Sequence, residues 1–154
     1  MAFNLATVTA FISTLSMSGI VVKDYGTIQD DFDARQFPIL APDLYQPVTI
    51  QRVQRDSFGS GTTARQTILY TIPYVLACYD QGEGRGVRDI APGVATAIST
   101  VATALIKNDT PGDLNVDMVL QNATINVIVN DPRGTGYHGA RLVVLVKEYV
   151  DGVP

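Results

Sequence analysis

Residues 67–107 read TILYTIPYVLACYDQGEGRGVRDIAPGVATAISTVATALIK, a β-rich run followed by a helical one. The first part, Thr67–Tyr79, is long and rich in β-branched and aromatic residues, which is typical of a strand. Pro73 lies inside it, and because proline donates no ladder hydrogen bond, we expect an edge, a bend or a bulge there. A strand followed by a helix of this kind predicts a sheet with a helix packed on it.

The helical part has start and stop signals of its own. Asp89 is suited to the N-cap, Pro92 to the first turn and Lys107 to the negative end of the helix dipole. The large apolar residues at helical spacing are Val94, Ile98, Val101 and Leu105, and Ala95, Ala102 and Ile106 widen the same stripe. The outer face is small and uncharged, with Thr96, Ser99, Thr100 and Thr103. We expect a helix with one buried face.

A first helix is expected over Asn4–Met17, with Gly19 able to stop it. Its large residues fall at helical spacing, and its other face carries hydroxyl groups and no charge, which suits burial against another subunit. Ala2–Val22 contains no charged residue. However, no Lys or Arg precedes its apolar part and many hydroxyls interrupt it, so we expect neither a signal peptide nor a membrane span.

The remaining segments complete the plan. Phe37–Val48 contains three prolines and predicts an extended strap with Ile39, Leu40, Leu44 and Tyr45 as apolar anchors. Further strands are expected over Val48–Gln54, Val116–Leu120, Ala123–Val129 and Ala140–Val150, with Ala123, Ile125, Val127 and Val129 on one side. We therefore expect a single domain over residues 1–154. Its class is α+β, with an antiparallel or mixed β-sheet flanked by two main α-helices and long hairpin loops.

The composition argues for a folded protein that does not wrap nucleic acid. Hydrophobic residues make up 46% of the chain, which is enough for a buried core and argues against disorder. The formal net charge is -4, whereas a protein that wraps nucleic acid usually carries a positive balance. We expect no tight DNA or RNA binding. A weakly acidic surface can still face DNA that slides past it.

Few side chains are suited to catalysis or to metal binding. Cys78 is the only cysteine, lies in an apolar run and is expected to be a buried small hydrophobe in a reducing compartment. His138 is the only histidine and is expected on a surface loop, which indicates neither a catalytic triad nor a usual zinc site. Gly82–Gly86 lacks the Walker pattern, and its Glu83 would repel phosphate. We expect no enzyme, no cofactor and no metal.

Three segments beside apolar runs mix glycine, arginine and small polar residues: Arg55–Arg65, Tyr79–Asp89 and Asn130–Gly139. We expect loops longer than the 2–5 residues of ordinary hairpins, and such loops are often functional. Arginine pairs bidentately with carboxylates and is enriched at interfaces. The candidates are Arg55, Arg65, Arg85, Arg88 and Arg133, which could meet Asp30, Asp31, Asp33 and Asp80 of neighbouring subunits in a head-to-tail ring. The alternative is that these arginines are solvated and each contributes little.

In its order of elements the chain resembles the tail terminator, or tail-completion, proteins of tailed bacteriophages. The resemblance covers most of the length and rests on organisation, without a diagnostic motif. Its parts are the helix Asn4–Met17, the proline-punctuated segment Phe37–Pro47, the hairpin Val48–Tyr79, the helix Pro92–Lys107 and the closing strands Ala123–Tyr149. No residue is carried over from the family as a site.

The resemblance implies a virion structural protein of the tail and neck, assembled in the host cytoplasm. Members of the family form hexameric rings that cap the tail tube, end its polymerisation and join the tail to the neck and head. The implied partners are other copies of the chain, the tail tube protein, a neck or head-completion protein and, in contractile tails, the sheath protein. Genome DNA would pass through the lumen without specific binding, and no membrane is implied.

Three other functions stay open. Other head–tail connector, neck and tail-tube proteins share much the same small α+β plan. A small hydrolase with a carboxylate site would have His138, Asp80 and Asp131 as its best candidates. A small-molecule binding module would use the apolar face of the sheet.

Overall fold

The computed structural model describes residues 5–55, 65–81, 87–107 and 116–151. In chain order these residues form α1 (Leu5–Ser13), β1 (Val21–Val22), a 3-10 helix (Ala34–Gln36), β2 (Ile39–Pro42), β3 (Thr49–Arg55), β4 (Arg65–Asp80), α2 (Val87–Lys107), β5 (Val116–Asn130) and β6 (Gly136–Asp151). Within them, six strands form one mixed sheet and two α-helices accompany it. The α+β class and the sheet with two helices are therefore confirmed.

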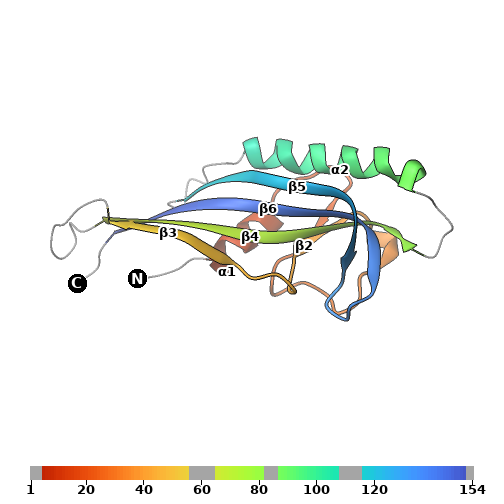
Figure 1. The fold of residues 1–154 in the computed structure, drawn as a ribbon, viewed down its shortest axis with the longest axis horizontal. Helices are drawn as coiled ribbons and strands as arrows, with labels where there is room; N and C mark the ends of the chain where they lie inside the picture. The colour runs from red at the N-terminus through yellow and green to blue at the C-terminus, as the bar shows by residue number, and fades with distance from the viewer. Residues whose placement is uncertain (1–4, 56–64, 82–86, 108–115, 152–154) are drawn as a thin grey trace.

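The sheet is built around β4. β6 pairs with one side of β4 along its whole length, while β2 and β3 share the other side, all antiparallel. β5 continues the sheet beyond β6 in antiparallel fashion, and β1 adds to β2 in parallel. Figure 1 shows β4, β5 and β6 running the length of the molecule, with α2 lying along β5.

Pro73 lies in β4 at the gap between β3 and β2. β3 pairs with β4 as far as Thr71, and β2 pairs with it from Tyr74 onward. The Pro73 carbonyl accepts a hydrogen bond from the Asp43 amide in this gap (2.9 Å). In an antiparallel strand, the nitrogen and the carbonyl of one residue point to the same side. The Pro73 nitrogen therefore also faces the gap, where no strand residue pairs with it, so the proline costs no ladder hydrogen bond. The proline therefore marks a break between partner strands, and β4 itself is continuous.

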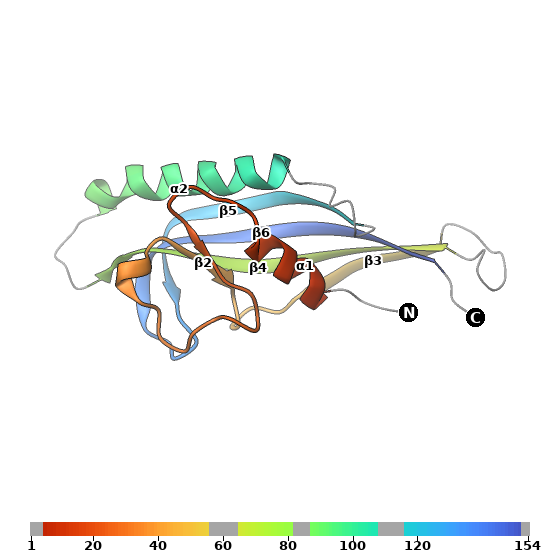
Figure 2. The ribbon, with the colours of Figure 1, turned by 180° about the vertical axis from the view of Figure 1, so that it is seen from behind.

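Both helices cover one face of the sheet, which we call the helix face. Alternate residues of β4 and β6 point into this core, and Figure 2 shows α1 in front of β4. The strand side chains Tyr70, Ile72, Leu142 and Val144 pack with Val8 and Ile12 of α1 and with Val94, Val101 and Leu105 of α2. Each such large side chain contributes about 1.5–3 kcal/mol when fully buried. The apolar spacing in the sequence correctly identified this face of α2.

The opposite face, which we call the open face, is covered at one end only. There Phe32 and Phe37 contact the ring of Tyr137, with centroids 5.8 and 5.2 Å away, over Val75 and Val129. Toward the end where β4 begins, no described element covers the open face. Among the described residues the helix face is therefore packed except at its edges, and the open face is covered at one end only.

β5 is one strand where two were expected, and two β-bulges interrupt its alternation. The register with β6 shifts between Leu120 and Asn122 and again between Ile125 and Val127. At the second bulge Asn126 has a φ of 59°, in the left-handed region that asparagine tolerates. Ile125 and Val127 therefore lie on opposite faces, and the expectation that they share one side is wrong. An inserted residue reverses every later side chain, and a period-2 pattern cannot reveal it.

Several boundaries also differ from the expectation. α2 begins at Val87, so Asp89 lies within the first turn and Pro92 lies inside the helix. α1 ends at Ser13. The segment Phe37–Val48 is not extended throughout, because the chain turns at residues 44–45, and its first part joins the sheet as β2. Pairing with β4, which the proline pattern did not indicate, accounts for this difference.

The third expected long loop is short. β5 ends at Asn130 and β6 begins at Gly136, so the connection is an ordinary hairpin turn of residues 131–135. The glycines that suggested a loop, Gly136 and Gly139, are paired strand residues opposite Asn130 and Val127. Most of the other two expected loops, residues 56–64 and 82–86, lies outside the described residues.

Candidate functional site

The acidic turn and the β5–β6 turn meet at one end of the sheet. The Arg133 amide donates to the Asp30 carbonyl (3.2 Å), and its guanidinium pairs with the Asp31 carboxylate (3.2 Å). Asp33 pairs instead with Arg35 (3.0 Å), whose side-chain hydrogen bond holds the pKa of Asp33 below its ordinary value. Both ion pairs are exposed, so each contributes little to stability. We call this group of residues, 30–35 with 131–135, the acidic corner.

Asp131 fixes the acidic corner from inside. Its side chain is fully buried. One carboxylate oxygen accepts the amides of Arg133 (3.1 Å) and Thr135 (3.0 Å), and the other accepts the Phe32 amide (3.3 Å) and the Tyr137 hydroxyl (2.8 Å). Burial, together with the hydrogen bond to Asp131, raises the pKa of Tyr137 and keeps it a donor. A carboxylate engaged in this way is suited to holding two segments together, and it is poorly placed to act as a hydrolase acid or base.

Tyr45 adds apolar surface to the acidic corner. Its hydroxyl donates to the Pro132 carbonyl (2.9 Å), while its ring and the neighbouring Leu44 stay about half exposed. The other two expected anchors of the strap, Ile39 and Leu40, are buried. Tyrosine and arginine are enriched among the residues that dominate protein interfaces. The corner therefore presents Tyr45 and Arg133 together on a rigid support.

The remaining sequence candidates fall at two ends of the sheet. Asp80 ends β4 opposite Tyr137, and Arg88 lies exposed in the first turn of α2, both toward the acidic corner. Arg55 ends β3 and Arg65 begins β4 at the far end, where the backbone alone is described. β4 has 16 residues, so at about 3.3 Å each the two ends lie roughly 50 Å apart. Arg85 lies outside the described residues.

The sheet has two long open edges among the described residues. β3 pairs only with β4, and β5 pairs only with β6. These edges lie at the same level of the sheet, because one row runs straight across it from Arg52 through Leu69 and Lys147 to Asp117. β3 and β5 run in opposite directions, since three successive antiparallel pairings separate them. Unpaired strand edges are ready templates for pairing with another chain.

Exposed apolar side chains accompany these edges, and the sequence did not identify them as a site. Ile50 and Val53 on β3 are 51% and 54% exposed, although their cross-strand neighbours Tyr70 and Ile68 are buried in the core. Ile106 of α2 is 68% exposed, and Ala95 is exposed too. The expectation that Ile106 and Ala95 belong to the buried stripe is therefore wrong. α2 packs chiefly against the edge strand β5, so its outer flank has no sheet beneath it.

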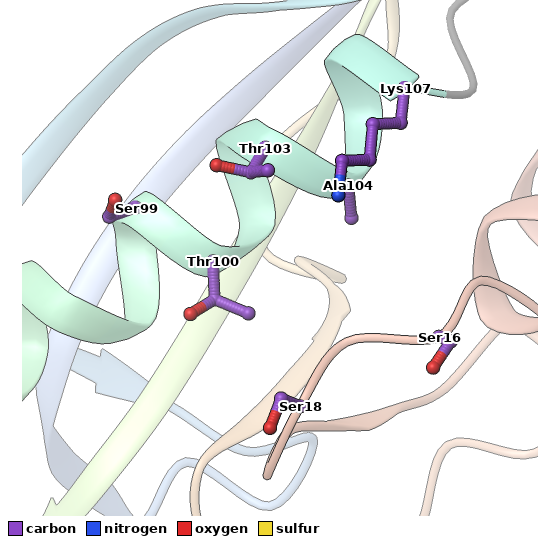
Figure 3. A pocket seen from close by; sticks show the side chains of 7 residues that line it. All are labelled: Ser16, Ser18, Ser99, Thr100, Thr103, Ala104 and Lys107. Carbon is purple, nitrogen blue, oxygen red and sulfur yellow. The ribbon is translucent and has the colours of Figure 1, made fainter.

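A hydroxyl-lined cleft of about 310 Å³ lies between α2 and the connection from α1 to β1 (Figure 3). Its lining comes from Ser16, Ser18, Ser99, Thr100, Thr103, Ala104 and Lys107. One side of the cleft is the hydroxyl-bearing face of α2 that the sequence singled out, and the other is formed by Ser16 and Ser18, which follow the end of α1. The hydroxyls offer hydrogen bonds without a charge, and Lys107 adds one positive charge to the lining.

The residues suited to chemistry are dispersed. Cys78 is buried as expected, and burial raises its thiol pKa to about 12, so it is a poor nucleophile. His138 lies within β6 and is half-buried, so its expected place on a surface loop is wrong. In the described part of the chain, no group of three or more His, Cys, Asp or Glu residues could hold a metal ion. The expected absence of an enzyme activity, a cofactor and a metal stays a prediction.

Comparison with known proteins does not assign the chain to a family. No protein-family model matches the sequence, and no curated protein is significantly similar to it. The helix segment Arg88–Lys107 is long and apolar enough to cross a membrane by length and composition, a property that it shares with core helices of globular proteins. Part of this helix is the buried stripe on β5 and β6.

Proposed function

We propose that the chain is a structural protein of a tailed-bacteriophage virion that assembles into a homo-oligomeric ring. The ring, a hexamer by analogy with the tail terminators that the chain resembles, caps the tail tube, ends its polymerisation and joins the tail to the neck. The feature of the fold that carries this proposal is the pair of open edges, β3 and β5, at one level of the sheet.

The two edges are suited to a ring because they differ from each other. If copies are related by rotation about an axis along the strands, β3 of one copy lies beside β5 of the next. The two strands are then antiparallel and level, so the alternation of directions continues from copy to copy. An interface between two different surfaces closes into a ring when the rotation closes.

The same orientation gives the two ends of the subunit different neighbours. The acidic corner with Tyr45 and Arg133 would lie on one side of the ring, and the end with Arg55 and Arg65 on the other. A ring between tail tube and neck needs two different axial surfaces. This arrangement supports contact with tube protein on one side and a neck protein on the other, with sheath protein as a further partner in a contractile tail.

Tube growth in vitro tests this function. Purified chain, added to polymerising tail tube protein at one ring per tube end, should arrest elongation, and electron micrographs should show a ring at the arrested tip. The matched control is the same tube protein without the chain, whose length should keep increasing. Tubes that reach the control length with bare tips would contradict capping. Rings that extend the tube would instead favour a tail-tube protein.

A further inference from the structure

Four exposed apolar residues lie on the helix face at its two edges: Ile125 of β5 and, toward the end where β4 begins, Ile50, Val53 and Ile106. Ile50 and Val53 project from β3 on the helix face, because they pair with Tyr70 and Ile68, which point into the helix-covered core. Ile106 lies in the last turn of α2, on the same side of the sheet. Isolated exposed apolar residues are ordinary, but apolar residues grouped at two opposite edges are typical of an interaction surface.

Ile106 lies on the flank of α2 that faces away from α1. Thr100, Thr103 and Lys107 line the cleft beside the α1–β1 connection (Figure 3). At 100° per residue, Ile106 lies on the outer part of the other flank, between Ser99 of the cleft and the small residues Ala95 and Ala102. Since α2 lies along β5, this flank overhangs the open edge of the sheet (Figure 1).

The two apolar groups also lie at one level along the strands. Val53 is in the row that runs through Ile68 and Glu148 to Val116, the first residue of β5. α2 ends at Lys107 and β5 begins at Val116, and Figure 1 shows both at the same end of the sheet, so Ile106 lies near that end. A rotation that brings β5 of one copy to β3 of the next therefore brings Ile106 over Ile50 and Val53.

Charge complementarity on the open face favours the same contact. Arg52 is exposed on β3, and its side chain lies on the open face because it pairs with Leu69. Asp117 of β5 ends the same row on the same face. Asp117 already has neighbours within its own chain: the Tyr149 hydroxyl donates to one of its oxygens (3.0 Å), and Lys147 lies opposite it on the same face. An ionised carboxylate accepts from more than one donor, so an arginine of the next copy can join this group. Edge-to-edge pairing would place these opposite charges side by side.

We propose that the seam between subunits of the ring is made by these residues of two copies of the chain. Ile106 of one copy covers Ile50 and Val53 of the next on the helix face, and Arg52 pairs with Asp117 of the adjacent copy on the open face. The inference rests on the proposed ring and adds to it a direction, a register and a side-chain contact. The contact is head-to-tail, so each copy uses both halves once.

Site-directed cross-linking tests the helix-face half of the seam. The double variant Val53→Cys/Ile106→Cys, treated with a short bis-maleimide, should give a ladder of covalent oligomers that ends at ring size. A mixture of the two single variants should give covalent dimers only, and each single variant alone should give none. The native Cys78 adds little background because it is buried and its thiol pKa is raised to about 12.

The matched control is Val53→Cys/Val119→Cys. Val119 replaces Ile106 in this pair and lies on β5, the edge strand along which α2 lies. It is 47% exposed, but it is on the open face, because it pairs with Leu145. This pair should not cross-link. If the wild-type protein forms rings and the Val53/Ile106 pair gives no ladder, the seam is wrong while the ring stands. If the wild-type chain stays monomeric even with tube protein, the proposed function itself fails.

Charge reversal tests the open-face half without added cysteines. Arg52→Glu alone and Asp117→Lys alone should each raise the concentration for half-assembly by about fivefold, and the double variant should restore most of the loss. Thermal unfolding of each monomer shows whether the fold is retained. If the assembly losses of the two single variants add up in the double variant, Arg52 and Asp117 do not pair across the seam.

Discussion

Replacing Gly139 by alanine is expected to destabilise the protein by about 3 kcal/mol or more. A Cβ atom built at Gly139 would collide with the backbone carbonyl of Leu76 on β4. A backbone atom in the middle of a paired strand cannot rotate away as the end of a side chain can. The β4–β6 pairing would therefore have to separate at this point.

Gly139 occupies this place because the sheet bends there. It pairs with Ala77 on one side and with Val127 on the other. Each partner strand has a register shift beside that pair, at Cys78 in β4 and at Asn126 in β5. Bulges on both neighbours increase the local twist, and glycine in a strand allows the close backbone approach that results.

Urea unfolding of Gly139→Ala beside Gly26→Ala measures the effect. A Cβ at Gly26 would meet only an ordinary contact with an Asp24 oxygen at 3.5 Å, so this control should stay within about 0.5 kcal/mol of the wild type. If the two alanine variants unfold at the same urea concentration, the close packing of β4 on β6 at Leu76 is not as described.

Replacing Asp131 by alanine is the second change with a large expected effect, a loss of about 2–4 kcal/mol. The change removes the acceptor of the Phe32 and Thr135 amides. The Arg133 amide and the Tyr137 hydroxyl lose their bonds to Asp131 and keep only longer contacts, with the Asp30 carbonyl (3.2 Å) and the Phe32 carbonyl (3.5 Å). Asp131 is fully buried, so water does not readily replace it. The acidic corner should loosen, because its two halves are joined through this carboxylate.

Hydrogen exchange and urea unfolding together separate this role from a general loss of stability. In Asp131→Ala the amides of Phe32, Arg133 and Thr135 should lose protection more than those of β3, which lie at the far end of the sheet. The control Asp30→Ala removes an exposed carboxylate of the same corner and should change stability by less than about 0.5 kcal/mol. If the Phe32 amide exchanges as slowly in Asp131→Ala as in the wild type, Asp131 does not hold the two segments of the acidic corner together.

Much of the fold was predictable because local pattern and burial agree. The apolar spacing of α2 identified Val94, Val101 and Leu105 as core residues, and the β-rich run around Pro73 became the central strand. The apolar spacing wrongly placed Ile106 among the buried residues. α2 lies over the edge strand β5, so the sheet lies beneath only part of the apolar stripe of this helix. It failed at Ile125 and Val127 because a bulge leaves no trace in a period-2 pattern.

The candidate site was less predictable. Composition pointed to arginines and aspartates, and the structure brings Arg133 to Asp30 and Asp31. The supporting bond joins Phe32 and Asp131, which are 99 positions apart in the sequence. The sequence did not single out Arg52 and Asp117 as interface residues. They lie in one row only because four strands pair in this register, and the sequence pattern does not show that pairing. The interface roles of Arg55, Arg65, Arg85 and Arg88 stay predictions.

The central claim is that this chain closes into a ring, and the mass of the assembled protein tests it most directly. Native mass measurement across a dilution series, with and without tail tube protein, should find one dominant closed species. For six copies of a 16.6 kDa chain that species weighs about 100 kDa. A monomer at every concentration, or an open series of sizes without a preferred one, would contradict the ring.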